Sequence, residues 1–187
     1  MDLKTCKPSI LGGVLAVVLV GTLMVAEAPQ SSLLQRSGAQ SRLPRGAVAP
    51  AFQLPRIQGG VLELNELQGA SSVLVFVTPT CPYCTELKQS LIDQGLPNLR
   101  HRLVFISRGS KALDERPAEV QALDAHIASR FPVLQDTTGR VSEAYKVMSV
   151  PTTYLLDGEG EVVASEVGVS GGLELVQELV AELSERR

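Results

Sequence analysis

A run of apolar residues followed at once by two closely spaced cysteines is the feature that most constrains the fold of this chain. Residues 73–77 are continuously apolar and rich in β-branched side chains, which predicts a strand buried on both faces. After Cys81 and Cys84, apolar residues recur at helical spacing, and the polar residues between them, Lys88 included, are assigned to the solvent side of an amphipathic helix. The order strand, turn and helix therefore places Cys81 at a helix N-terminus.

This position has consequences for the chemistry of Cys81. Unpaired backbone N–H groups and the positive end of the helix dipole stabilise an anion, so a thiol at such a site ionises more easily. Cys84 lies one helical turn further on, within disulfide reach, and can resolve a mixed disulfide formed at Cys81. Pro82, with its fixed φ and missing N–H, suits the first turn of a helix. The pattern predicts Cys81 and Cys84 as a catalytic redox pair.

A zinc site and a structural disulfide are the alternatives for a C-x-x-C pair. Zinc normally requires two further Cys or His ligands, and the remaining candidates, Cys6, His101 and His126, have no metal-like spacing. A disulfide across two residues closes too small a loop to stabilise a fold appreciably. We therefore expect a redox pair with no bound metal and no cofactor.

The N-terminal part of the chain predicts a membrane anchor. Residues 9–26 are apolar and uncharged, and at about 1.5 Å per residue they are just long enough for a hydrocarbon core of about 30 Å. The lysines before this segment favour an N-terminus that stays in the cytoplasm and export of the remainder. A signal peptide cleaved after Ala26-Glu27-Ala28 is the alternative. Pro29, directly after that site, and the length of the apolar run favour an uncleaved anchor.

Composition divides the chain into four parts. Residues 1–8 are predicted to be cytoplasmic and residues 9–26 to be the anchor. Residues 27–46 are rich in Ser, Gln, Arg, Gly and Pro without hydrophobic periodicity, which predicts a flexible linker. Residues 47–187 suffice for one folded domain. The net charge of −3 and the pI of about 5.5 give no indication of a nucleic-acid partner.

The hydrophobic pattern within residues 47–187 predicts strands and helices in the order β-α-β-α and then β-β-α. The expected elements are a strand at 73–77, a helix at 81–93, a strand at 103–107, a helix at 117–129, a hairpin of strands at 147–156 and 161–168, and a closing helix at 173–184 after a break at Gly171-Gly172. This order predicts an α/β fold with a central mixed β-sheet, parallel and then antiparallel, flanked by helices.

This order and its motifs resemble the thioredoxin superfamily, specifically the membrane-tethered TlpA/ResA-like redoxins and the related MauD-type accessory proteins. The resemblance covers residue 47 to the C-terminus, and its carriers are Ala49-Pro50-x-Phe52, Thr78-Pro79-Thr80-Cys81-Pro82-Tyr83-Cys84, Phe131-Pro132-Val133-Leu134 and Val150-Pro151-Thr152. It implies a thioredoxin-like fold, preceded here by one N-terminal transmembrane helix, and thiol–disulfide oxidoreductase activity.

The resemblance also implies a substrate platform beside the cysteines. It implies that Pro151 is cis and leaves the backbone of Val150 free to bind an extended peptide, whereas a trans proline at the start of an edge strand is the alternative. Tyr83 and Pro82, between the cysteines, are the other expected substrate contacts. Thioredoxins bury an acid on the strand before the active site, but residues 73–77 contain none, so no general base is assigned.

Together these patterns predict a thiol–disulfide oxidoreductase anchored by a single pass in the bacterial inner membrane, with its catalytic domain in the periplasm. The expected partners are exported cysteine-containing proteins and a membrane donor or acceptor of electrons. The motif leaves open whether the protein reduces or oxidises, because reduction potential sets that direction. The alternative is a non-catalytic binding or assembly factor for an exported protein.

Overall fold

The computed structural model of the chain describes residues 42–97, 99–109 and 117–185. The elements in chain order are β1 (Gln53–Pro55), β2 (Val61–Glu63), η2 (Leu64–Leu67), β3 (Ser72–Val77), α1 (Pro82–Asp93), η3 (Arg100–Arg102), β4 (Leu103–Arg108), α2 (Ala118–Arg130), β5 (Val133–Asp136), α3 (Arg140–Ala144), β6 (Thr152–Leu156), β7 (Val162–Val167) and α4 (Val169–Glu185). The predicted anchor at residues 9–26 lies outside the described residues. Among the helices of the described part, none is long and apolar enough to cross a membrane.

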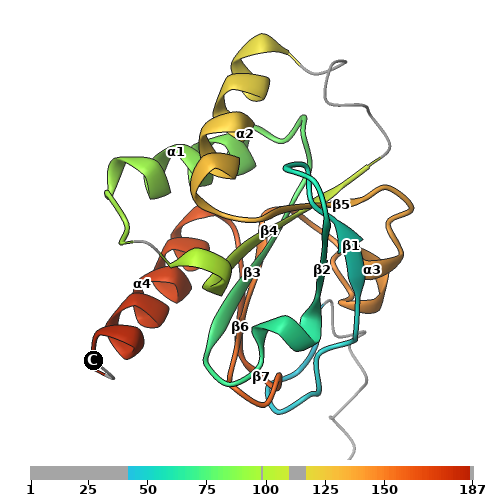
Figure 1. The fold of residues 1–187 in the computed structure, drawn as a ribbon, viewed down its shortest axis with the longest axis vertical. Coiled ribbons are helices and arrows are strands. Elements are labelled where there is room, and N and C mark those ends of the chain that lie inside the picture. Colours follow the sequence, from blue (N-terminus) through green and yellow to red (C-terminus); the bar gives the residue numbers. More distant parts are fainter. Residues whose placement is uncertain (1–41, 98, 110–116, 186–187) are drawn as a thin grey trace, which may run out of the picture. The chain divides into compact units, whose positions relative to one another are not determined.

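A five-stranded mixed sheet with the strand order β5-β4-β3-β6-β7 forms the centre of the fold (Figure 1). The middle strand, β3, is parallel to β4 and antiparallel to β6. Every residue of β3 is buried, as its uninterrupted apolar sequence predicted for a strand covered on both faces. The α/β fold with a sheet that is first parallel and then antiparallel is confirmed.

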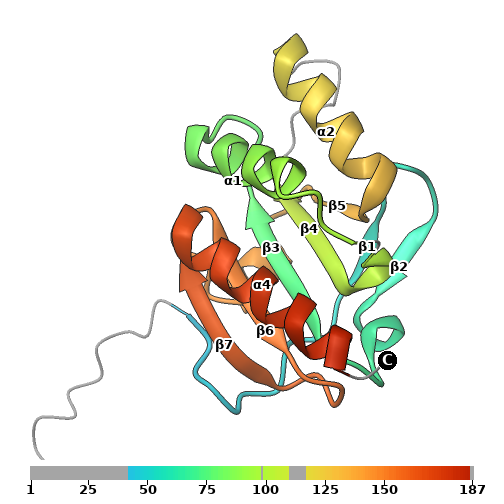
Figure 2. The ribbon, with the colours of Figure 1, turned by 90° about the vertical axis from the view of Figure 1, so that its left-hand side faces the viewer.

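Two hydrophobic clusters cover the two faces of the sheet. On one face α1, α2 and α4 pack together (Figure 2), with core residues that include Val75, Leu87, Phe105, Ile127 and Val176. On the other face Phe52 and Leu62, next to and within the β1–β2 hairpin, and Tyr145, after α3, pack with Phe76 of β3 and Tyr154 of β6. Alternate residues of β3 therefore anchor opposite clusters, because successive side chains of a strand point to opposite faces.

Both edges of the central sheet carry a further stretch of chain. At β7, the backbone N–H of Gly46 donates to the Val162 carbonyl at 2.8 Å. At β5, the N–H of Ile57 donates to the Val133 carbonyl at 2.9 Å. The packed part of the chain thus includes residues 42–46, which the sequence assigned to the linker.

Helix α4 begins earlier than predicted, and the expectation that Gly171-Gly172 breaks the chain before it is wrong. Both glycines lie inside α4, which starts at Val169. A Cβ atom on Gly172 would stand 3.0 Å from Oγ1 of Thr153 and 3.1 Å from a methyl carbon of Leu87. Glycine is used because α4 passes too close to the sheet and to α1 for a side chain, and not because the helix must stop.

Replacing Gly172 by alanine is expected to lower the free energy of unfolding by about 1–2 kcal/mol. Overpacking costs about 1–3 kcal/mol, and the better helix propensity of alanine offsets up to about 1 kcal/mol of this. Urea denaturation measures the difference, with the exposed Ser170→Ala in the same turn as the matched control. A Gly172→Ala protein as stable as the wild type would show that the helix can shift away at no cost.

Candidate active site

Cys81 lies at the carboxyl end of the central strand β3, where the chain turns into α1. It is the N-cap of α1, with an extended backbone (φ −87°, ψ 115°), and its Sγ accepts a hydrogen bond from the Cys84 N–H at 3.2 Å. Pro82 occupies the first turn, as predicted. The sulfur takes the place that a serine or aspartate oxygen usually holds at a helix N-cap, and it accepts from one of the N–H groups of the first turn.

The two cysteines differ in their access to solvent. Both are free thiols; Cys81 is partly exposed, and Cys84 is only 1% exposed within the cluster between the sheet and the helices. An incoming disulfide therefore meets Cys81 first. Cys84 can reach only a sulfur that is already attached to Cys81.

Burial is the main reason that the pKa of the Cys84 thiol is raised from 9.0 to about 12. Its hydrogen bond with Cys81 raises the pKa as well, while a hydrogen bond with the Thr78 backbone and the positive charge of Lys88 act in the opposite direction. Cys84 is therefore a protonated thiol at neutral pH.

The raised pKa of Cys84 predicts a loss of stability in alkali. A thiol whose pKa is higher in the folded than in the unfolded protein stabilises the fold below its unfolded pKa, and this stabilisation disappears as pH rises through the folded pKa. We expect the free energy of unfolding to fall between pH 9 and about 12, by at most about 1.4 kcal/mol per pH unit from this group. Urea denaturation of wild type and Cys84→Ala across this range isolates the effect, and parallel pH profiles would contradict it.

The loop before β6 faces the cysteine pair. The sequence predicted a strand from residue 147, but β6 begins only at Thr152, and residues 147–151 form a loop. The Val150–Pro151 peptide bond is cis, as the resemblance implied. The Cys81 thiol donates to the Val150 carbonyl at 3.5 Å, whereas the N–H of Val150 donates to none of the residues that the structure describes.

A cavity of about 450 Å³ lies beside this loop. It is lined by Tyr83, Glu86, Val150, Pro151, Val167, Gly168 and Val169. The Tyr83 side chain is 64% exposed, and its neighbour Pro82 is also exposed. The structure thus brings three of the four predicted substrate contacts to one cavity, whereas Pro82 is not among the residues that line it.

Lys88 is buried, and the prediction that it faces solvent is wrong. Its Nζ lies 2.5 Å from Oδ1 of Asp124 in α2, and the two side chains are 5% and 3% exposed. The pair was missed because α2 covers this side of α1. One signal was present: Asp124 stands one turn from Ile127, on the apolar face of its helix, where an acid needs a partner.

Comparisons with known proteins agree with this geometry. The sequence profile of the AhpC/TSA family matches residues 45–165. The chain is 26% identical over 170 residues to the thioredoxin-like protein YneN of Bacillus subtilis, covering 90% of this chain and 95% of YneN. It is 30% identical over 133 residues to the thiol–disulfide oxidoreductase ResA of Bacillus subtilis, covering 67% of this chain and 69% of ResA.

Solved structures share the fold. The thioredoxin domain of a thiol–disulfide oxidoreductase from Bacteroides vulgatus aligns with a TM-score of 0.56 at 21% identity, over 74% of this chain and 99% of that domain. The thioredoxin resemblance drawn from the motifs is therefore confirmed. With its family profile matched over more than half of its length, the chain belongs to the AhpC/TSA family and is a thioredoxin-like thiol–disulfide oxidoreductase.

Proposed function

We propose that Cys81 and Cys84 form the dithiol centre through which this protein exchanges disulfides with exported proteins. The observation that carries the proposal is the asymmetry of the pair: Cys81 is accessible and caps a helix with its sulfur, while Cys84 is buried behind it. A pair of cysteines with a purely structural role would not require that one sulfur be accessible and lie at the positive end of a helix.

The exchange proceeds in two substitutions at sulfur. The Cys81 thiolate attacks a substrate disulfide, forms a mixed disulfide and releases one substrate sulfur as a thiolate. Cys84 then loses its proton and attacks Sγ of Cys81, which breaks the mixed disulfide and releases the second substrate thiolate. The substrate has gained two electrons, and the protein holds a Cys81–Cys84 disulfide. The same steps in reverse oxidise a substrate dithiol.

Val150, Pro151, Tyr83 and Pro82 are proposed to bind the substrate segment around its reacting cysteine. The N–H of Val150, which donates to no residue within the described ranges, supports this role, because an extended peptide can accept a hydrogen bond from it. The uncharged segment at residues 9–26 supports an anchor in the bacterial inner membrane with this domain in the periplasm. A membrane donor or acceptor of electrons would then reset the cysteine pair.

Trapping of mixed disulfides tests the proposal. A Cys84→Ser full-length protein, expressed in a bacterium and quenched with acid, is expected to accumulate adducts with exported proteins on a non-reducing gel. The matched control, Cys81→Ser/Cys84→Ser, keeps Cys6 and should show none of these adducts. Adducts that persist in the double variant, or that never form, would contradict the assignment of Cys81.

Equilibration of the cysteine pair with glutathione decides the direction of exchange. A potential near about −120 mV, that of DsbA, identifies an oxidant, and one near about −270 mV, that of thioredoxin, identifies a reductant.

A further inference from the structure

A second cavity, of about 470 Å³, lies beside the loop at residues 147–151 and shares Val150 with the cavity beside Tyr83. It is lined by Thr78, Pro79, Thr80, Arg108, Gly109, Val147, Met148, Ser149 and Val150. Thr80 directly precedes Cys81, and the Val150 carbonyl contacts the Cys81 sulfur. A substrate residue next to the reacting cysteine is therefore within reach of this cavity.

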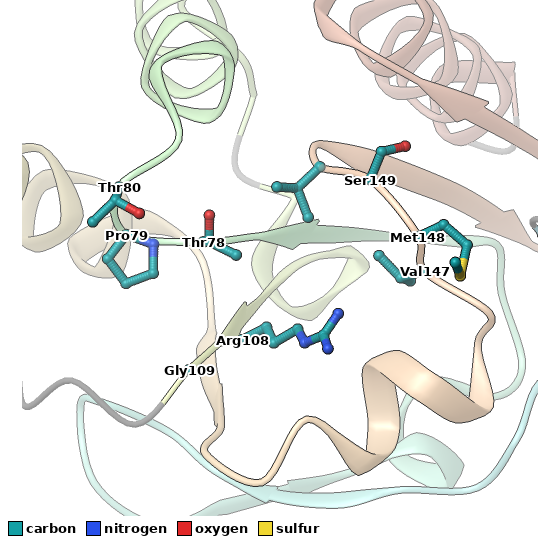
Figure 3. A pocket seen from close by; sticks show the side chains of 9 residues that line it. Thr78, Pro79, Thr80, Arg108, Gly109, Val147, Met148 and Ser149 are labelled. Atoms are coloured by element: carbon teal, nitrogen blue, oxygen red, sulfur yellow. The ribbon is translucent and has the colours of Figure 1, made fainter.

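One charged side chain points into it. Arg108, the last residue of β4, extends between the Thr78–Thr80 segment and the Val147–Ser149 segment, as Figure 3 shows. Its side chain packs over Gly139, where a Cβ would stand 3.2 Å from the arginine Nε. Arg108 forms no ion pair with any residue in the described ranges. The acid beside it in the sheet, Asp136 of β5, instead accepts hydrogen bonds from the N–H groups of Val141 and Ser142 and from the Ser142 hydroxyl. Within the described residues the Arg108 charge is therefore not engaged in an ion pair.

The rest of the lining suits an acidic side chain. Thr78, Thr80 and Ser149 offer hydroxyl groups, while Val147 and the 78% exposed Met148 offer apolar contact. A guanidinium binds a carboxylate through two parallel hydrogen bonds, and hydroxyl donors can complete its shell. The apolar residues can pack on the methylene groups of a glutamate. By contrast, the charged side chain at the cavity beside Tyr83 is Glu86, so the two flanks of Cys81 differ in sign.

We propose that Arg108 and its cavity bind a carboxylate side chain adjacent to the reacting cysteine of the substrate, so that the protein prefers exported substrates with an acidic residue at that position. This inference rests on the proposed function and adds to it a substrate class. Arg108 acts as a specificity residue and takes no part in the exchange of sulfur bonds.

Peptides that carry one cysteine as a mixed disulfide with nitrothiobenzoate test the preference. Their reaction with Cys81 releases coloured nitrothiobenzoate, and the peptides differ only in having Glu, Gln or Lys immediately before or after the cysteine. In at least one of these positions we expect the Glu peptide to react about five-fold faster than the Lys peptide at low ionic strength, the size of an exposed ion pair. Salt should shrink the ratio.

Charge variants complete the test. Arg108→Gln is expected to bring the Glu/Lys ratio close to one, and Arg108→Glu to invert it. The matched control is Arg45→Glu, an exposed arginine next to Gly46, which pairs with β7 at the end of the sheet opposite Cys81; its ratio should equal that of the wild type. Equal rates for all peptides with the wild-type protein would overturn this inference and leave the proposed function standing. No release from any peptide would instead contradict the proposed function.

Discussion

Replacing Cys81 by serine is expected to bring insulin reduction by the full chain down to the uncatalysed rate. The serine hydroxyl cannot form the mixed disulfide, and Cys84 cannot substitute for it because it is 1% exposed and its pKa is raised to about 12. The measurement is insulin turbidity with dithiothreitol as electron source, beside a sample without protein.

Cys6→Ser is the matched control, because it removes the third cysteine of the chain and leaves the pair intact. It should reduce insulin at the wild-type rate. A wild-type protein no faster than Cys81→Ser would favour the alternative of a non-catalytic binding or assembly factor, in which the fold serves only as a peptide platform.

Replacing Lys88 by methionine is expected to lower the free energy of unfolding by about 3–5 kcal/mol. Methionine keeps the length and the apolar stem of lysine but removes the ammonium, which leaves the 3% exposed Asp124 carboxylate without the Lys88 charge. Urea denaturation at neutral pH measures the loss. The double variant Lys88→Met/Asp124→Leu is expected to regain most of it, since two apolar side chains can replace a buried ion pair.

The same substitution at the exposed Lys146 provides the matched control, with an expected change within about 0.5 kcal/mol. If Lys88→Met were as stable as Lys146→Met, the ion pair between α1 and α2 would make no net contribution to the free energy of unfolding. A double variant less stable than Lys88→Met would show that the aspartate has a favourable role of its own.

The parts of the fold that the sequence predicted are those with local causes. The apolar run at residues 73–77 and the helical spacing after Cys81 are patterns of neighbouring residues that determine the secondary structure locally. Both elements formed where expected. The cis bond at Pro151 followed from a resemblance, because a single sequence contains no local signal that separates cis from trans.

The features that the sequence did not reveal depend on which elements meet. The polar character of Lys88 gave no indication of α2, which covers it. The two glycines of α4 resembled a helix break because their reason lies in packing, of Gly171 against Glu166 and of Gly172 against Leu87 and Thr153. Arg108 was not predicted for the same reason. Its cavity exists only once the end of β4 meets the loop before β6.

The occupied edges of the central sheet limit how other proteins can join this one. Exposed strand edges invite a foreign strand to continue the ladder of backbone hydrogen bonds, a common route to aggregation and to peptide capture. Here the backbone N–H of Gly46 already bonds to β7, and that of Ile57 bonds to β5. A foreign strand therefore finds these positions on both outer strands already bonded, which disfavours association of two sheets edge to edge at these places.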